Sequence, residues 1–74
     1  MSNRVEKISI KDDFIKLDQF LKYAAVTGTG GESKYMIQEG MVKVNGEVET
    51  RRGKKLRSGD KISIDGIDEE FIIE

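Results

Sequence analysis

The chain has 74 residues and a formal net charge of -1, and hydrophobic and charged residues each make up 36% of it. It contains no cysteine and no histidine, which excludes disulfide bonds, thiolate or imidazole metal sites, and catalysis by a cysteine nucleophile or a histidine proton shuttle. Because the chain has no secretory signal and no apolar run long enough to span a membrane, we expect a cytoplasmic protein with no membrane partner. We also expect no cofactor and no small-molecule substrate. A chain of this length closes one small core, so we expect residues 1–74 to form a single domain.

The first third of the chain predicts a strand and then a helix. Residues 5–10 alternate apolar and polar side chains, interrupted by one charged pair, which indicates a short strand. After them the period lengthens, and Asp12 or Asp13 is expected to cap a first helix. Its apolar face has the spacing i, i+3, i+4, i+7 and consists of Leu17, Phe20, Leu21 and Ala24.

A glycine-rich segment, TGTGG at 27–31, separates this helix from a second one at 32–40. In the second helix Ser33, Met36 and Ile37 share a face, and Gly40 supplies the C-terminal stop. The glycines could also form a phosphate-binding loop at a helix N-terminus. Because the segment lacks the Gly-Lys-Ser/Thr ending and the βαβ context of nucleotide sites, a turn between helices is the favoured interpretation.

The second half of the chain predicts strands, beginning with a hairpin around Asn45-Gly46. A two-residue turn would pair Val44 with Glu47. A three-residue loop would instead pair apolar with apolar and basic with acidic residues, and it is favoured for that reason. Its expected pairs are Val42 with Val48 and Lys43 with Glu47.

Two further strands are expected at 61–64, after a Ser58-Gly59-Asp60 turn, and at 70–74. The expected fold class is therefore α+β, with a two-helix hairpin packed on a small antiparallel sheet. The predicted core consists of the three phenylalanines and of the apolar residues of these elements: Phe14, Phe20, Phe71, Leu17, Leu21, Ile37, Val42, Val44, Leu56, Ile62 and Ile64.

Positive charge is concentrated in residues 51–57, called the basic segment, where five of seven residues are Lys or Arg. Residues 51–61 contain six Lys or Arg residues and one acid, a local charge of +5 that leaves -6 for the rest of the chain. Such a segment can present a basic face to a polyanion while the other faces repel it. A solvated, charged loop and a nuclear-import signal are the alternative interpretations.

The residues KLDQFLKYAAVTGTGGESKYMIQEGMVKVNG (16–46), followed by RSGDKISI, resemble the RNA-binding domain named after the fourth protein of the small ribosomal subunit, the S-four domain. The resemblance covers residues 16–66. It rests on a basic residue before Leu-Asp, a second helix ending Ile-x-x-Gly, a Val-x-Val-Asn-Gly hairpin and a Gly-Asp turn. The chain looks most like the short stand-alone bacterial members of the YaaA and YbcJ type.

This resemblance implies a fold with the αL motif and non-catalytic binding of structured RNA. The expected partner is ribosomal RNA in ribosome assembly or on a ribosomal particle, with tRNA as another possibility. The basic positions of the family fall on Lys16 and Lys34, and also on Gly30 and Met41, which are neutral, so the basic segment is expected to compensate. The candidate RNA-binding residues are Lys16, Lys34, Lys43, Arg51, Arg52, Lys54, Lys55 and Arg57.

Two questions stay open at this point. Tyr23 and Tyr35 are either stacking platforms for an unpaired base or half-buried cover for the core. The alternative function is a protein-interaction module that uses the basic loop to dock an acidic partner. An enzyme is not expected, because the adjacent carboxylate pairs Asp12-Asp13 and Glu69-Glu70 have no nucleophile or histidine nearby.

Overall fold

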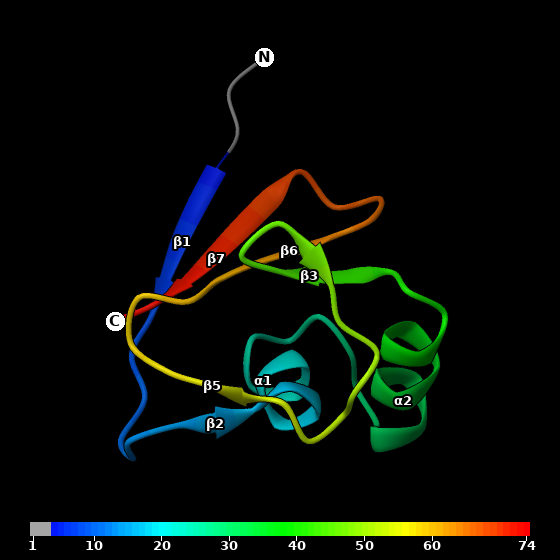
Figure 1. Ribbon diagram of the computed structural model, residues 1–74, viewed down its shortest axis with the longest axis horizontal. Helices are drawn as coiled ribbons and strands as arrows, with labels where there is room; N and C mark the ends of the chain where they lie inside the picture. The colour runs from blue at the N-terminus through cyan, green and yellow to red at the C-terminus, as the bar shows by residue number, and fades with distance from the viewer. Residues whose placement is uncertain (1–3) are drawn as a thin grey trace.

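The computed structural model describes residues 4–74, in which two helices lie on one side of a five-stranded β-sheet (Figure 1). A second, two-stranded sheet lies beside the first helix. The elements in chain order are β1 Arg4–Ile8, β2 Ile15–Lys16, α1 Leu17–Tyr23, α2 Gly30–Gln38, β3 Val42–Val44, β4 Glu47–Val48, β5 Lys55–Leu56, β6 Lys61–Ile64 and β7 Glu69–Ile73.

The larger sheet confirms the α+β class and adds a parallel strand pair to it. Its order is β1-β7-β6-β3-β4, and β3, β4, β6 and β7 pair in antiparallel fashion. The strand expected at 5–10 is β1, which ends at Ile8 and runs parallel to β7, with Val5 opposite Glu70. An alternating pattern identifies a strand but not its direction, so the sequence could not show this parallel pairing.

The core lies between the helices and the sheet. Phe20 of α1 meets Phe71 of β7 edge to face, with ring centroids 5.6 Å apart. Every predicted core residue is buried except Phe14, which is only half-buried, and Ile8 and Ile73 join the core. The prediction for Phe14 was wrong because the chain around it runs along the surface into β2 instead of forming helix.

Both helices begin at residues other than those predicted. Residues 15–16 form β2, so α1 starts at Leu17 with Lys16 at the N-cap, and the expected cap by Asp12 or Asp13 was wrong. The second helix starts earlier than predicted, at Gly30, because Thr29 caps it by accepting a hydrogen bond from the backbone N–H of Glu32 at 3.2 Å. Gly40, with φ of 75°, ends α2 as predicted.

The hairpin register was also predicted wrongly. Val44 lies opposite Glu47 and Lys43 opposite Val48, the pairing of a two-residue turn. Asn45 and Gly46 both have positive φ, 53° and 87°, as a type I′ turn requires, and the right-handed twist of hairpin strands favours that turn over apolar matching. This register leaves Val48 54% exposed and brings Glu49 into a half-buried position.

The Asn45 side chain ties the turn to the neighbouring strand. Its Oδ1 accepts a hydrogen bond from the backbone N–H of Lys61 at 3.0 Å, and its Nδ2 donates to Oδ1 of Asp60 at 3.1 Å. The hairpin is therefore held against the start of β6. Neither helix in the part of the chain that the structure describes has the length and apolar character needed to cross a bilayer.

Candidate nucleic-acid interface

The basic segment is held in place by its backbone. The carbonyls of Lys54 and Arg52 accept hydrogen bonds from the backbone N–H groups of Leu17 and Asp18, at 2.8 and 3.2 Å. These contacts satisfy donors at the start of α1 that have no partner within the helix. The same segment continues into β5, which pairs with β2. The backbone at Arg52, Lys54 and β5 is thus held in place, and the side chains of Arg51, Arg52, Lys55 and Arg57 are exposed.

Leu56 attaches the basic segment to the core. It is fully buried in the core and lies opposite Ile15 in the β2–β5 pair. Strand residues alternate between faces, so burying Leu56 turns its neighbours Lys55 and Arg57 toward solvent. Leu56 therefore determines which way Lys55 and Arg57 face.

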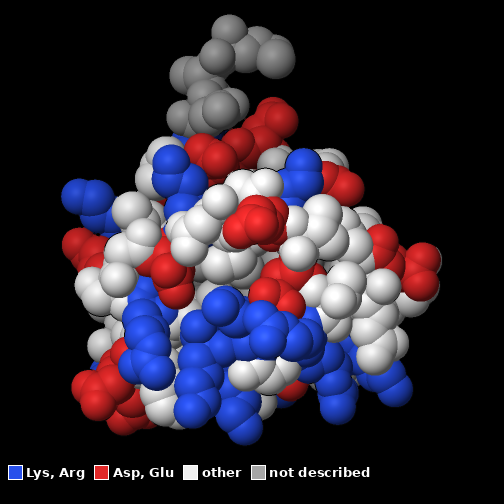
Figure 2. All heavy atoms as spheres, in the orientation of Figure 1, with Lys and Arg blue, Asp and Glu red and all other residues white. Residues whose placement is uncertain are grey.

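Several cations lie together as a result. Lys16 is directly opposite Lys55 in the β2–β5 pair. Figure 2 shows the Lys and Arg side chains gathered over the lower part of this face, around β5 and the loop that precedes it, with acidic side chains mainly above and to the sides. The term basic surface denotes the following six residues: Lys16, Arg51, Arg52, Lys54, Lys55 and Arg57.

The basic surface contains a shallow hollow of about 470 Å³. Gly53 lies in its lining, where a Cβ would meet nothing within 4 Å, so the backbone is open to a close approach. The other lining residues are all cationic: Arg51, Lys54, Lys55 and Arg57. A phosphate fits this combination of positive charge and accessible backbone.

Arg51 differs from its neighbours because it has a carboxylate partner. Its Nε and Nη2 donate to the two carboxylate oxygens of Glu49, at 2.9 and 3.2 Å, and its backbone N–H donates to Oε2 at 3.1 Å. The side-chain hydrogen bond from Arg51 lowers the pKa of Glu49, and the same contact raises the pKa of Arg51. Within residues 4–74 no other cation of the basic surface forms an ion pair, so Arg51 is the least available of them for a phosphate.

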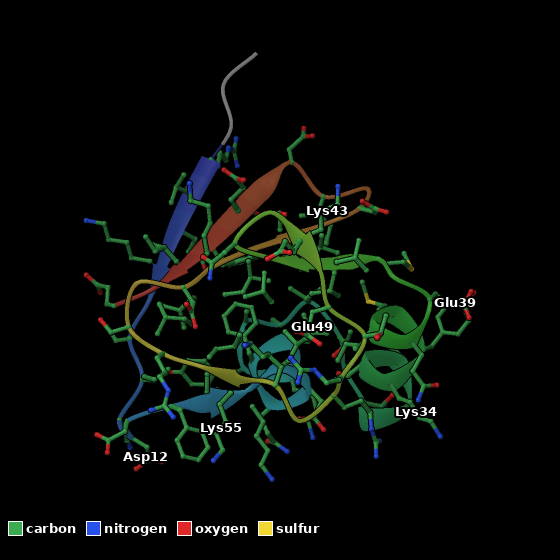
Figure 3. All side chains as sticks on the ribbon, in the orientation of Figure 1. Asp12, Lys34, Glu39, Lys43, Glu49 and Lys55 are labelled. Carbon is green, nitrogen blue, oxygen red and sulfur yellow. The ribbon has the colours of Figure 1, made fainter. Side chains whose placement is uncertain are left out.

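The remaining candidate residues lie at different distances from the basic surface. Figure 3 shows Lys34, on α2, at the lower side of the molecule together with Lys55. Lys43 lies at the upper side, on β3, opposite Ser63 and Val48. The structure therefore brings Lys16 and the residues of the segment 51–57 together, places Lys34 on the same side, and leaves Lys43 apart.

The structure shows that both tyrosines are exposed and that Phe14 lies at the basic surface. Tyr23 is 61% exposed and Tyr35 63% exposed, so neither covers the core. Phe14 lies beneath two cations of the basic surface, with the Nζ of Lys55 at 4.8 Å and the Cζ of Arg57 at 5.7 Å from the ring centroid. These are cation–π distances. The apolar ring of Phe14 predicted a core position, and no local pattern in the sequence shows that Lys55 and Arg57 lie over it.

Residues 27–29 of the glycine-rich segment form a turn between the helices, the favoured interpretation, and Gly30 and Gly31 begin α2. The Glu32 carboxylate accepts a hydrogen bond from the backbone N–H of Gly28 at 2.8 Å, and Thr29 accepts the one from Glu32. Two backbone donors near the start of α2, those of Gly28 and Glu32, are therefore already engaged, and a negative charge lies beside them. Within the described residues, no cluster of three or more carboxylates is arranged to hold a metal ion.

The sequence is similar to a protein family and to individual proteins from other organisms. The family model described as "S4 domain", the S-four domain of the resemblance above, matches residues 8–73. The Bacillus subtilis protein named "Probable ribosome maturation protein RlbA" is 48% identical over 59 residues, which cover 80% of this chain and 83% of that protein. The Escherichia coli protein named "Putative RNA-binding protein YbcJ" is 38% identical over 56 residues, which cover 76% and 80%.

The fold is similar as well. The solution structure of YbcJ from Escherichia coli, reported to reveal an αL motif involved in RNA binding, superposes with a TM-score of 0.64 at 29% identity. The superposition covers 97% of this chain and 90% of that one. The structural similarity therefore covers nearly the whole of both chains.

Proposed function

Because this chain belongs to the S4 domain family, we propose that it binds structured RNA through its basic surface and catalyses no reaction on it. Family membership confirms the resemblance seen in residues 16–66. We propose further that residues 1–74 act as one binding domain.

One observation carries the proposal: the cations project from a backbone that is already fixed. Lys and Arg side chains neutralise phosphates and release condensed counterions, which gives binding energy that falls with added salt. The hydrogen bonds from Leu17 and Asp18 to the segment hold these cations near one another before RNA arrives. Preorganised groups lose less conformational entropy on binding.

The target is expected to be recognised by shape. An A-form duplex has a deep, narrow major groove, so its base edges are inaccessible and its phosphates and ribose hydroxyls are what a protein meets. The basic surface would contact the phosphates of one strand, and Lys34 would hold α2 against the same duplex or junction. Lys43 would reach RNA only where the bound molecule extends past β3.

The names of the relatives support a ribosomal target. One relative is named for ribosome maturation and another for RNA binding. We therefore favour ribosomal RNA, on an assembling or complete ribosomal particle in the cytoplasm, over tRNA.

The test is fluorescence anisotropy across a salt series, with ribosomal RNA fragments, tRNA and a duplex DNA as probes. About five phosphate contacts predict a slope of log affinity against log salt of about -4 for the wild-type protein. The variant Arg52→Gln, Lys54→Gln, Lys55→Gln should lose affinity by more than about tenfold and flatten the slope by about 2 to 3.

A control of equal charge separates local from general electrostatics. Arg4, Lys7 and Lys61 are exposed residues of β1 and β6, and changing all three to glutamine alters the net charge by the same amount. This variant should keep the wild-type affinity within a few fold. Equal losses in both triple variants would contradict binding through the basic surface.

The alternative, an interaction module for an acidic protein, is supported by the neutral residues at Gly30 and Met41. It predicts a complex with a protein partner that survives nuclease treatment. The RNA proposal predicts ribosome association that nuclease or high salt disrupts. Pull-down with and without nuclease therefore distinguishes the two functions.

A further inference from the structure

A second hollow, with a largely apolar lining, lies beside the basic surface. It has a volume of about 290 Å³. Pockets for drug-sized ligands are usually about 300–1,000 Å³, so this one suits a single small ring system. We name it the aromatic groove, and it is lined by Ile10, Lys11, Asp12, Phe14, Ile15 and Tyr23.

The Tyr23 ring of the groove is exposed, yet it is held in place. Tyr23 donates a hydrogen bond from its hydroxyl to the backbone carbonyl of Ser9 at 3.0 Å, although its side chain is 61% exposed. Ile10 and Ile15 pack against the core and form a firm apolar floor. An exposed aromatic ring whose position is fixed is suited to stacking with another flat ring.

Charge is divided sharply between the groove and its border. Within the lining, Lys11 and Asp12 carry opposite charges, so the interior is close to neutral overall. At the Phe14 wall, Lys55 and Arg57 of the basic surface lie 4.8 and 5.7 Å from the ring centroid. Figure 3 shows Asp12 and Lys55 on the same lower edge of the molecule. A nucleotide has the same division, a neutral aromatic base joined to an anionic phosphate.

We propose that the aromatic groove receives one unpaired base of the bound RNA, while Lys55 and Arg57 hold the phosphates beside it. This inference rests on the proposed RNA binding. A continuous duplex keeps its bases stacked inside the helix, so it cannot fill the groove, whereas a bulge or loop can present a base turned outward. The protein thereby distinguishes RNA with an unpaired base from a duplex of the same charge.

The experiment compares three RNA hairpins that share one stem: fully paired, with a single-nucleotide bulge, and with an abasic site in place of the bulged base. Stacking of one base predicts that the bulged hairpin binds roughly 5- to 100-fold more tightly than the paired one. The abasic hairpin should bind like the paired one, because it keeps the phosphate and the distortion of the bulge but lacks the ring.

Variants of the groove test its residues. Tyr23→Ala and Phe14→Leu should each bring the ratio of the bulged to the paired affinity close to one. Tyr23→Phe should keep most of the preference, since it retains the ring and loses only the hydrogen bond to Ser9. Tyr35→Ala is the matched control, because Tyr35 is equally exposed, at 63%, but lies on α2 outside the groove. Thermal melting followed by circular dichroism establishes that each variant is folded.

The outcomes separate the two proposals. Equal affinity for all three hairpins, with binding still sensitive to salt, would overturn the base pocket and leave RNA binding standing. No affinity for any RNA would overturn both. If Tyr23→Ala leaves the preference for the bulge unchanged, the unpaired base does not bind in this groove and the proposal is overturned.

Discussion

The basic segment 51–57 and the glycine-rich segment 27–31, a turn that leads into α2, both look like anion-binding elements in the sequence, but the fold engages different backbone groups in each. In the basic segment, backbone carbonyls are engaged with the start of α1, and the cationic side chains are left outside. In the turn, backbone N–H groups are engaged by Thr29 and by the carboxylate of Glu32. An anion site therefore depends on which donors the fold has left free.

The two regions also differ in what holds them. The basic segment depends on an apolar anchor, Leu56, which is fully buried. The turn depends on a buried hydrogen bond between the hydroxyls of Thr27 and Ser33, with the oxygens 2.6 Å apart. Substitutions in the basic segment should therefore destabilise the protein through lost packing. Substitutions in the turn should destabilise it by leaving a buried hydroxyl without a hydrogen bond.

The largest effect is expected from Leu56→Ala. Removing a fully buried leucine should cost about 2–5 kcal/mol of unfolding free energy, a large share of the stability of so small a domain. Urea denaturation followed by circular dichroism measures it. Leu56→Met conserves volume and should cost less than about 1.5 kcal/mol. If alanine and methionine destabilise the protein equally, Leu56 is not the packing anchor of the basic segment.

Ser33→Ala should weaken the turn by about 1–3 kcal/mol, because it leaves the hydroxyl of Thr27 buried without its partner. Replacing both groups by apolar ones, Thr27→Val with Ser33→Ala, should be less damaging than the sum of the single changes. Chemical denaturation of the four proteins gives the coupling energy. A coupling close to zero would show that this hydrogen bond does not hold the turn.

Gly30→Arg should add a cation at the start of α2, directly after the turn. A Cβ at Gly30 meets nothing within 4 Å, and residues four apart on a helix share a face, so the new cation would lie beside Lys34. RNA affinity should rise several fold, and the salt slope should steepen by about 0.7–0.9. Stability should change little, because Gly30 is exposed and such surface substitutions usually change stability by no more than about 0.5 kcal/mol.

The control for this gain is Gly30→Gln, which has a long polar side chain without the charge. Anisotropy titrations at several salt concentrations compare the two. Equal affinities for the Arg and Gln variants would place the start of α2 outside the RNA contact.

The smallest effect is expected from Glu49→Gln, which releases Arg51. Because Arg51 lowers the folded-state pKa of Glu49, the pair stabilises the fold above the usual value of 4.5, and this contribution is lost as the pH falls through the lowered value. The difference in Tm between wild type and Glu49→Gln should thus be constant near neutral pH and shrink below pH 4.5. RNA affinity at neutral pH should rise slightly, because Arg51 then faces phosphate without a competing carboxylate. A Tm difference that persists unchanged at low pH would contradict the pairing.

Much of the fold was accessible from local patterns. The buried face of α1, the stop at Gly40 and the turn at Gly59 follow from spacing and turn chemistry, and all are present. The prediction of the hairpin register was wrong because it relied on matching side-chain types across the strands. The geometry of the two-residue turn at Asn45-Gly46 determines the register instead. At the site, the run of Lys and Arg residues in the sequence predicted the cluster of cations. The ion pair between Glu49 and Arg51 could have been predicted from their separation of two residues.

The sequence by itself determined the α+β class, the family, the helices and strands in outline and the position of the basic segment, because periodicity, turn residues and charge are local properties of a chain. Only the tertiary structure decided that β1 runs parallel to β7, that the start of α1 engages the carbonyls of Arg52 and Lys54, and that Phe14 lies beneath Lys55 and Arg57. These features join residues far apart in the chain, and they depend on packing and on which hydrogen-bonding groups the remainder of the fold leaves free.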